Sequence, residues 1–416
     1  MLRRGPRPLL LHLTLAMLKS SVSVRASPNL NAGWPGWSEN AAEQVRAIAE
    51  AVQRAAAGQP GAFPQAVLME ALRQDRELIA GIAAYRRHPW RRDLPDPPVL
   101  WTEGNSRLLD FGTGHAANAG PVLLFVPSLV NRASVLDLAP GRSMVRWLAA
   151  QGLRVLLLDW GWPGVAERHF TLTDYIAGRL ERALLAAGAL AAGGRLVLAG
   201  YCMGGLLTVA AAQRRPDLVA ALALLATPWD FHAADPDRAT QLARLAPLLE
   251  PAMAFAGTLP VDLLQLLFAL LDPFGVATKY RAFARLDQDS DRARLFVALE
   301  DWLNDGVPLA APVARECLTG WYGANTPGND AWTVAGLPVS PASLNLPCFV
   351  ATPGRDRIVP PESARPLAAL IRGAVLHEPA AGHIGMAAGS GAERALWRPL
   401  LEWVRGIRAG RGDWPT

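Results

Sequence analysis

Residues 196–205 read Leu-Val-Leu-Ala-Gly-Tyr-Cys-Met-Gly-Gly, an apolar run that leads directly into a cysteine flanked by glycines. The apolar run is typical of a strand buried on both faces, and the residues that follow have a helix-like pattern. A sharp strand-to-helix turn needs small residues where helix and strand pass closely, and Gly200, Gly204 and Gly205 supply them. Such a turn would hold the sulfur of Cys202 above the sheet, at a helix amino terminus that favours a thiolate.

Cys202 stands where the pattern Gly-x-nucleophile-x-Gly places a nucleophile, so we expect it to attack a substrate carbonyl. The amide of the next residue, Met203, is expected to donate to the oxyanion that forms. For the turn taken alone, a small buried cysteine beside glycines is an open alternative. Cys317 and Cys348 have no such setting and are expected to pack in the core.

Two downstream loops supply an acid and a base in the order nucleophile, acid, histidine. Asp356 lies in a loop after the apolar residues 348–352, where an orienting carboxylate is expected, although a turn aspartate beside Gly354 is an alternative. His383 lies in a glycine-flanked loop and is expected to be the general base. His377, at the end of a predicted strand, is the less favoured candidate.

Short apolar runs alternate with helical segments from about residue 100, which is the pattern of a parallel sheet covered by helices. The runs lie at residues 122–126, 155–158, 196–199, 222–226, 348–352 and 374–376. Together with the nucleophile turn, this alternation predicts the α/β class and an α/β-hydrolase fold with a mostly parallel central sheet.

The segments outside this alternation are predicted to be helical. Residues 229–335 interrupt it and are predicted to form a helical cap insertion. Residues 27–98 are predicted to form a helical N-terminal extension. The predicted core then comprises residues 99–228 and 336–416, and an apolar segment, 1–26, precedes the extension.

The segment 1–26 begins with basic residues and continues with an apolar stretch, a layout that signal peptides share with surface helices. The stretch contains His12, ends at Lys19 and is shorter than the ~20 residues needed to span a bilayer. We expect a membrane-surface helix or a core-packing helix, with a cleaved signal as the alternative.

Composition narrows the classes of function. Hydrophobic residues make up 51% of the 416 residues and charged residues 19%, which allows a large core and argues against global disorder. The formal net charge of +5 comes without a dense basic run, so nucleic-acid binding is not expected. Three cysteines without Cys-x-x-Cys spacing argue against a disulfide framework and a structural zinc site, and favour a reducing compartment. No metal is expected.

Over most of residues 100–390 the chain resembles the polyhydroxyalkanoate synthases, especially the shorter two-subunit type. The matching stretches are Val126-Pro127-Ser128-Leu129-Val130-Asn131-Arg132, Ser134-Val135-Leu136-Asp137-Leu138-Ala139-Pro140, Asp159-Trp160-Gly161-Trp162-Pro163, Asp174-Tyr175-Ile176, and the three loops of Cys202, Asp356 and His383. The combination is specific, whereas dienelactone hydrolases share nearly the same Gly-Tyr-Cys-Met-Gly-Gly turn. This chain departs from the family in having Pro127-Ser128-Leu129 where Pro-Pro-Trp is commoner.

The resemblance implies an acyltransferase that polymerises (R)-3-hydroxyacyl-CoA through a Cys202 acyl-enzyme and releases CoA. It implies a triad of Cys202, Asp356 and His383, and an oxyanion hole made by the amides of Met203 and of the loop near Val130. No cofactor is implied beyond the CoA thioester substrate. The implied partners are a second copy of the chain or a second synthase subunit, and the polymer granule surface. The implied location is the cytoplasm, with association to the granule.

Two other functions are compatible with parts of the pattern. A Cys-type α/β hydrolase acting on an ester, lactone or polyester would use the same triad and differ in the access of water. A catalytically silent, granule-associated binding protein would have no need of Cys202, Asp356 and His383 together, so the intact set argues against it.

Overall fold

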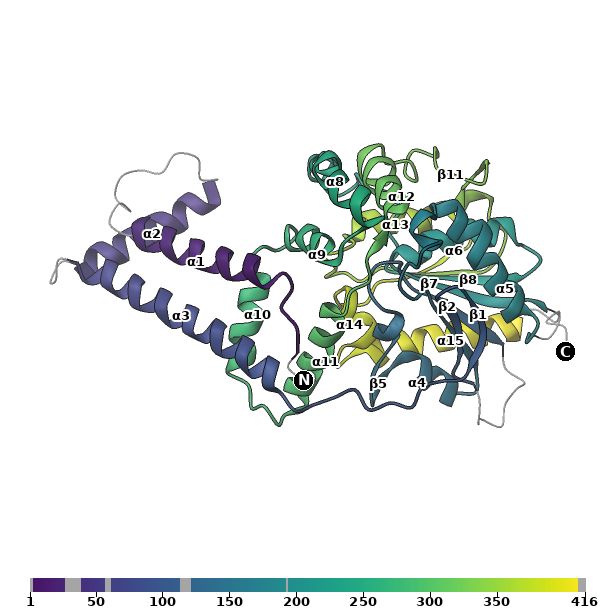
Figure 1. Ribbon diagram of the computed structural model, residues 1–416, viewed down its shortest axis with the longest axis horizontal. Helices are drawn as coiled ribbons and strands as arrows, with labels where there is room; N and C mark the ends of the chain where they lie inside the picture. The colour runs from purple at the N-terminus through teal and green to yellow at the C-terminus, as the bar shows by residue number, and fades with distance from the viewer. Residues whose placement is uncertain (1–2, 27–38, 57–60, 113–120, 192–193, 411–416) are drawn as a thin grey trace. The chain divides into compact units, whose positions relative to one another are not determined.

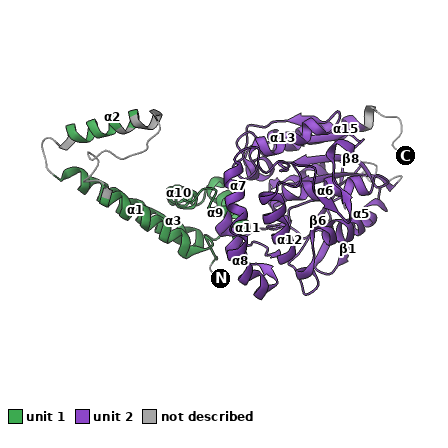
Figure 2. Cartoon of the chain, turned by 90° about the horizontal axis from the view of Figure 1, so that it is seen from above, with its two compact units in different colours: residues 1–90, 268–304 green, residues 91–267, 305–416 purple. Residues whose placement is uncertain are grey.

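The computed structural model describes residues 3–26, 39–56, 61–112, 121–191 and 194–410. The chain divides into two compact units (Figure 2): unit 1 comprises residues 1–90 and 268–304, and unit 2 comprises residues 91–267 and 305–416. The segment 229–335, treated as one insertion in the sequence analysis, is therefore shared between the two units. The predicted domain boundaries themselves stay predictions.

Within the described residues, eight strands of unit 2 form one sheet in the order β1-β2-β6-β3-β7-β8-β13-β14. Figure 1 labels four of them, β1, β2, β7 and β8. These strands are β1 (Val99–Glu103), β2 (Ser106–Asp110), β3 (Val122–Val126), β6 (Arg154–Asp159), β7 (Leu196–Tyr201), β8 (Val219–Leu225), β13 (Cys348–Ala351) and β14 (Val375–His377). β1, β2 and β6 pair antiparallel, and all neighbours from β6 to β14 pair in parallel. The predicted mostly parallel central sheet is confirmed.

The burial of the central strands explains why their apolar runs could be recognised in the sequence. Every residue of β3 and β7 is buried, and a strand covered on both faces needs an unbroken apolar sequence. The strands β1 and β2 at one end of the sheet were not indicated by the sequence. No residue of β1 is buried, and the buried residues of β2 alternate with exposed or half-buried ones. Unit 2 also contains α4 (Met144–Ala150), the π-helix η4 (Asp174–Leu180), α5 (Glu181–Gly188), α6 (Met203–Arg214), α13 (Pro361–Leu370), α14 (His383–Ala388) and α15 (Arg398–Gly410).

The segment 229–335 is mainly helical, as the sequence predicts. Its helices are α7 (Pro236–Ala243), α8 (Ala246–Ala256), α9 (Val261–Ala269), α10 (Gly275–Ala284), α11 (Asp291–Asn304), α12 (Ala311–Arg315) and the π-helix η6 (Glu316–Gly323). Short strands also occur, because β9 (Thr258–Leu259) pairs with β10 (Leu309–Ala310). Two-residue strands are too short to leave a recognisable alternation in a sequence.

Unit 1 is built from helices that come from distant parts of the chain: α1 (Leu9–Ala26), α2 (Glu39–Ala56), α3 (Ala62–Arg87), α10 and α11. Its aromatic core includes Tyr85 edge-on to Tyr280 at 5.7 Å and Phe283 stacked on Phe296 at 4.2 Å. The Tyr85 hydroxyl donates to Asp301 Oδ1 at 2.9 Å. Residues 27–38 and 57–60 of the predicted extension lie outside the described residues.

The apolar N-terminal segment forms α1, which packs against α3 and α10. Ala16 and His12 are buried, while the opposite face exposes the apolar side chains Leu10, Met17, Leu18 and Val22. One face of α1 therefore packs against the protein, as a core-packing helix would. The exposed apolar face is compatible with a membrane-surface helix, which stays a prediction. In the ranges that the structure describes, no helix is both long enough and apolar enough to span a membrane.

Candidate active site

Cys202 lies in the sharp turn between β7 and α6. Its backbone has φ 56° and ψ −127°, a conformation that costs free energy in a residue with a Cβ atom and is typical of strained functional turns. The Cys202 amide donates to the Leu225 carbonyl at the end of β8 at 2.8 Å. Hydrogen bonding to the neighbouring strand therefore holds the strained residue in place.

The glycines of the turn allow three backbone segments to come together. A Cβ atom at Gly204 would lie 2.1 Å from the carbonyl oxygen of Val126, where β3 ends. A Cβ atom at Gly200 would lie 2.4 Å from the Cα atom of Gly205, and one at Gly205 would meet the Thr227 side chain. Side chains cannot be accommodated at these distances, so the packing of β3, β7 and α6 requires the glycine pattern.

Asp356 and His383 meet beyond the carboxyl ends of the strands. His383 Nδ1 lies 2.6 Å from Asp356 Oδ2, and both side chains are buried. The other carboxylate oxygen, Oδ1, accepts the amides of Ile358 at 2.8 Å and Val359 at 2.9 Å. Because both oxygens of Asp356 are fixed, the carboxylate orients the imidazole and leaves Nε2 facing away from it.

The pKa of His383 reflects its two charged neighbours. Burial by itself would lower this pKa, but the Cys202 side chain, by charge and as a hydrogen-bond partner, and the Asp356 carboxylate together raise it to about 10. A protonated imidazole beside Cys202 stabilises negative charge on the sulfur. The three predicted residues are thus brought together in the order sulfur, imidazole, carboxylate.

Tyr201 supports His383 from the end of β7, a role that no sequence pattern indicates. Its hydroxyl donates to the backbone carbonyl of His383 at 3.2 Å, and the two rings lie 5.2 Å apart. Burial raises the pKa of Tyr201 well above its ordinary value, as do the nearby Cys202 and Asp356. The phenol therefore stays protonated and keeps donating to His383.

The two predicted oxyanion donors differ in the structure. Met203 is the first residue of α6, so its amide has no acceptor one turn earlier within the helix. The Val130 amide instead donates to Ser128 Oγ at 3.0 Å. The Ser128 hydroxyl therefore accepts this amide in the structure. For Val130 to serve an oxyanion, Ser128 must release it.

Trp160 holds the loop that follows β3, a role that was not predicted from the sequence. Its indole Nε1 donates to the Pro127 carbonyl at 3.0 Å, and its own carbonyl accepts from Ser106 Oγ at 3.0 Å. Arg179 Nη1 donates in turn to Ser106 Oγ at 2.9 Å. The available signal was an Asp-Trp-Gly stretch directly after a buried strand.

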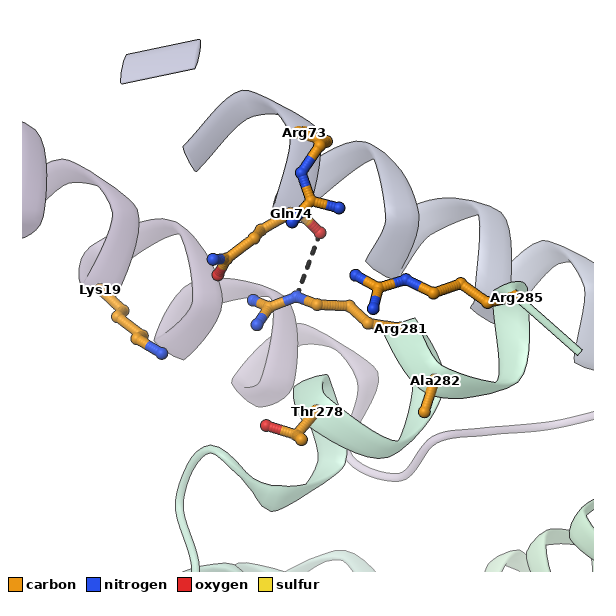
Figure 3. Close-up of a pocket in the computed structure, with 7 residues that line it drawn as sticks. All are labelled: Lys19, Arg73, Gln74, Thr278, Arg281, Ala282 and Arg285. Atoms are coloured by element: carbon orange, nitrogen blue, oxygen red, sulfur yellow. Dashed lines mark hydrogen bonds between the residues drawn. The ribbon is translucent and has the colours of Figure 1, made fainter. Parts of the chain in front are cut away.

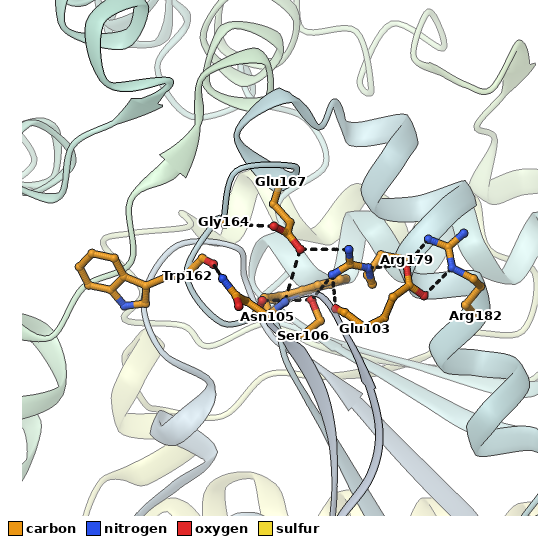
Figure 4. A network of polar contacts seen from close by, with 9 residues as sticks. Glu103, Asn105, Ser106, Trp162, Gly164, Glu167, Arg179 and Arg182 are labelled. Carbon is orange, nitrogen blue, oxygen red and sulfur yellow. Dashed lines mark hydrogen bonds and ion pairs between the residues drawn. The ribbon is translucent and has the colours of Figure 1, made fainter.

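Arg179 is the centre of a buried polar network at this edge of the sheet (Figure 4). Its guanidinium pairs with Glu103 at 3.0 Å and with Glu167 at 3.1 Å. Burial by itself would raise the pKa of Glu167, but hydrogen bonds, including those from Arg179 and the Asn105 amide, lower it. The network joins the β1–β2 hairpin to η4, and through Ser106 and Trp160 it supports the loop after β3.

Aromatic side chains from the segment after β8 and from η6 form a cluster, and one of its members, Tyr322, lies near Cys202. Phe231 lies 5.0 Å from Tyr322 and 5.7 Å from Trp321, measured between ring centroids. Burial raises the pKa of Tyr322, with a further contribution from the nearby Cys202. The cluster contributes apolar surface near the sulfur, while Cys202 itself is half-buried.

The remaining candidates lie outside this site. Cys317 and Cys348 are buried, and burial raises the pKa of both thiols, that of Cys348 to about 12. His377 Nε2 lies 2.6 Å from the carbonyl oxygen of Ala395, and its ring stacks on Phe349. Among the described residues there is no group of three His, Cys, Asp or Glu side chains spaced to hold a metal ion. The expectation of a metal-free site stays a prediction.

A model of the alpha/beta hydrolase fold matches residues 121–389, and this confirms the predicted fold. A protein of Haloferax mediterranei named poly(3-hydroxyalkanoate) polymerase subunit PhaC is 30% identical over 313 residues, covering 73% of this chain and 63% of that protein. A protein of the same name from Allochromatium vinosum is 30% identical over 293 residues, covering 70% of this chain and 82% of that protein. The chain therefore belongs to the PhaC family of α/β-hydrolase-fold proteins.

The extent of the match differs between relatives. The chain spans 63% of the length of the Haloferax relative and 60% of that of a Haloarcula marismortui relative with the same name. The matched part of this chain contains the elbow, the acid loop and the histidine loop within residues 121–389. The match to the alpha/beta hydrolase model thus spans the segment that carries the candidate active site.

Proposed function

We propose that this protein is an acyltransferase that polymerises (R)-3-hydroxyacyl-CoA into polyhydroxyalkanoate through a Cys202 acyl-enzyme, with release of CoA. The observation that carries the proposal is the hydrogen-bonded arrangement of His383 between Cys202 and Asp356 at a nucleophile elbow. The relatives named poly(3-hydroxyalkanoate) polymerase subunit PhaC support polymerisation to a polyhydroxyalkanoate, and the CoA thioester is part of the proposal.

The first half-reaction transfers the acyl group to the enzyme. Because Nδ1 of His383 is bound to Asp356, Nε2 takes the proton from the sulfur of Cys202. The thiolate attacks the thioester carbonyl, and the developing oxyanion is held by the Met203 amide. The bond between the carbonyl carbon and the CoA sulfur then breaks, and CoA leaves with the proton from His383.

The second half-reaction extends the polymer. His383 deprotonates the 3-hydroxyl of one acyl group, and the resulting oxygen attacks the carbonyl of another acyl group held as a thioester. An oxygen ester forms, the thioester bond breaks, and the sulfur regains a proton. A cysteine suits this chemistry because exchange of one thioester for another preserves the acyl-transfer potential, which a serine ester would lose.

Exclusion of water favours the transferase over the hydrolase. The same triad could hydrolyse its acyl-enzyme if water reached the carbonyl. The aromatic cluster of Phe231, Trp321 and Tyr322 has one member, Tyr322, near Cys202, and its apolar surface supports retention of the acyl group until a hydroxyl arrives.

Purified protein incubated with 3-hydroxybutyryl-CoA tests the assignment when both free CoA and the acyl product are followed. We expect CoA release with high-mass polyester in the wild type, loss of both in Cys202→Ala, and retention of both in Cys348→Ala, which removes a buried thiol elsewhere. CoA release with only free hydroxy acid would establish the hydrolase instead. Thiol labelling of Cys202 that is unchanged by His383→Ala would favour the silent binding protein.

The expected partners belong to the same proposal. The reaction needs no cofactor beyond the CoA thioester, and a second copy of the chain or a second synthase subunit completes the active assembly. The product places the protein at the polymer granule surface in the cytoplasm. Repeating the assay with longer acyl chains and with a candidate partner subunit tests this part, since no CoA release under any of these conditions would contradict it.

A further inference from the structure

A cavity of about 310 Å³ lies within unit 1, between α1, α3 and α10. Seven residues line it (Figure 3). The cationic ones are Lys19, Arg73, Arg281 and Arg285, and the others are Gln74, Thr278 and Ala282. The volume falls in the range of about 300–1,000 Å³ that small-molecule sites occupy. No acidic side chain is among the lining residues, so the cavity wall is positively charged.

Two of the four cations are balanced by carboxylates on α3. Arg73 pairs with Glu70 at 2.6 Å, which lowers the pKa of Glu70 to about 2, and it also pairs with Glu77. Arg285 pairs with Glu77 at 2.5 Å. These pairs fix the two guanidinium groups at the rim of the cavity and leave them little surplus charge.

Arg281 is different, because it is only 9% exposed and is not balanced. Its Nε donates to the Gln74 carbonyl at 3.1 Å, and Figure 3 shows the guanidinium reaching from α10 toward Gln74 and Lys19. In the part of the chain that the structure describes, no carboxylate lies within 4.0 Å of Arg281 or of Lys19. Burying a charged group without a counter-charge is unfavourable, so a bound anion would remove a real cost here.

Lys19 supplies a second unbalanced cation from another helix. Its ammonium lies 5.3 Å from the centroid of the Phe274 ring, a contact that orients the charge without neutralising it. A guanidinium can present paired N–H donors to a phosphate, and an ammonium adds a point charge from the side. The two unbalanced cations therefore match a compact group with several negative oxygens.

We propose that this cavity is a binding site for a phosphate group of a small molecule, with Arg281 as its principal donor and Lys19 as its second. The cavity lies within unit 1 and contains none of the residues assigned to thioester chemistry, so binding is independent of the proposed polymerase activity. A nucleotide-type phosphate and a lipid headgroup offer the same chemistry, and the experiment separates them.

Calorimetric titration of the full-length protein with inorganic phosphate and with pyrophosphate, at constant ionic strength, measures the site directly. We expect Arg281→Gln to weaken binding by about tenfold or more, as for the loss of a charge-assisted hydrogen bond, and Arg281→Lys to weaken it less. Lys19→Gln removes the second charge at an exposed position and is expected to weaken binding without affecting the fold. Arg76→Gln removes an exposed arginine on α3 outside the cavity and is the matched control.

Two further titrations identify the source of the phosphate. Adenosine diphosphate that binds more tightly than inorganic phosphate, with the same dependence on Arg281, would assign a soluble phosphate ester. Binding to vesicles of phosphatidylglycerol but not of phosphatidylcholine, again lost in Arg281→Gln, would assign a lipid headgroup. Phosphate binding that is absent, or that falls equally in Arg76→Gln, would overturn the proposal, and circular dichroism of each variant confirms that its fold is retained.

Discussion

The candidate active site in unit 2 and the basic cavity in unit 1 differ in whether their charged side chains are paired within the protein. In the active site, both oxygens of Asp356 and Nδ1 of His383 are already engaged by the protein. In the cavity, Arg281 uses its Nε on a backbone carbonyl and faces no carboxylate among the described residues. The first arrangement is preorganised by its own chain, whereas the second is completed only by a ligand. Substitutions should therefore have large effects in the first region and small effects in the second.

The largest effect is expected for Asp356→Asn. The asparagine can still accept the amides of Ile358 and Val359, but its NH₂ group would face His383 Nδ1 and favour the wrong tautomer. Loss of an equivalent carboxylate in other triads costs about 10⁴ in kcat, and we expect a fall of about 10³–10⁴ in CoA release. Asp217→Asn, at an exposed ion pair, is the control. A fall of less than tenfold would show that the carboxylate is not needed to orient the base.

Gly204→Ala should destabilise the fold of unit 2. The added methyl group would lie 2.1 Å from the Val126 carbonyl oxygen, and backbone atoms cannot move away as a flexible side chain could. We expect a loss of about 3 kcal/mol in the free energy of unfolding, measured by chemical denaturation. Gly406→Ala is the matched control, because nothing lies within 4 Å of its new Cβ atom in α15, and it should stabilise by about 0.5–1 kcal/mol. Equal effects at the two glycines would contradict the packing argument.

The raised pKa of His383 predicts a pH dependence of stability. A pKa raised from 6.5 to about 10 in the folded state means that folding favours the protonated imidazole. The resulting stabilisation is fully present below pH 6.5 and is lost as the pH rises through 10. Unfolding of the wild type and of His383→Gln, measured between pH 6 and 10.5, should give free energies that converge at the alkaline end. A constant difference across this range would refute the assignment.

Trp160→Phe should have a smaller effect that is confined to the chemical step. The substitution leaves the buried Pro127 carbonyl without its indole donor, at a cost of about 1–3 kcal/mol. Because the loop after β3 would lose a fixed position, we expect kcat to fall about tenfold while KM changes little. Trp162→Phe is the control, in the loop after β6. Its exposed ring lies 5.6 Å from Arg132 Cζ, and because phenylalanine keeps a ring there, both constants should change little. A change in KM alone would argue that Trp160 contacts substrate rather than positions the loop.

The smallest effect is expected for Arg281→Met in phosphate-free buffer. The substitution removes a buried, unbalanced charge, and this gain offsets the loss of the hydrogen bond from Arg281 to the Gln74 carbonyl. The free energy of unfolding should therefore fall by less than about 1 kcal/mol, or it should rise. Thermal unfolding with and without phosphate measures this directly. A loss of several kcal/mol without phosphate would mean that Arg281 is a structural residue, and the contrast between the two regions would disappear.

The sequence was most informative where local pattern and chemistry coincide. Cys202 could be recognised because the strand, the glycines and the following helix are contiguous, and each is required by the same sharp turn. Asp356 and His383 could be named because the carboxyl ends of parallel strands meet at one edge of a sheet. The strands β1 and β2 at one end of the sheet escaped notice, since their apolar runs are only three and two residues long.

The sequence by itself therefore determined the fold class, the chain order of the three candidate catalytic residues and the need for glycine at the turn, because these depend on short-range geometry. Only the tertiary structure decided that the Ser128 hydroxyl accepts a hydrogen bond from the Val130 amide and that Trp160 fixes the loop after β3. It also decided that residues 268–304 complete a unit with residues 1–90, and that Arg281 is buried there without a counter-charge. These contacts join residues far apart in the chain, or depend on side-chain burial, and neither leaves a periodic trace in the sequence.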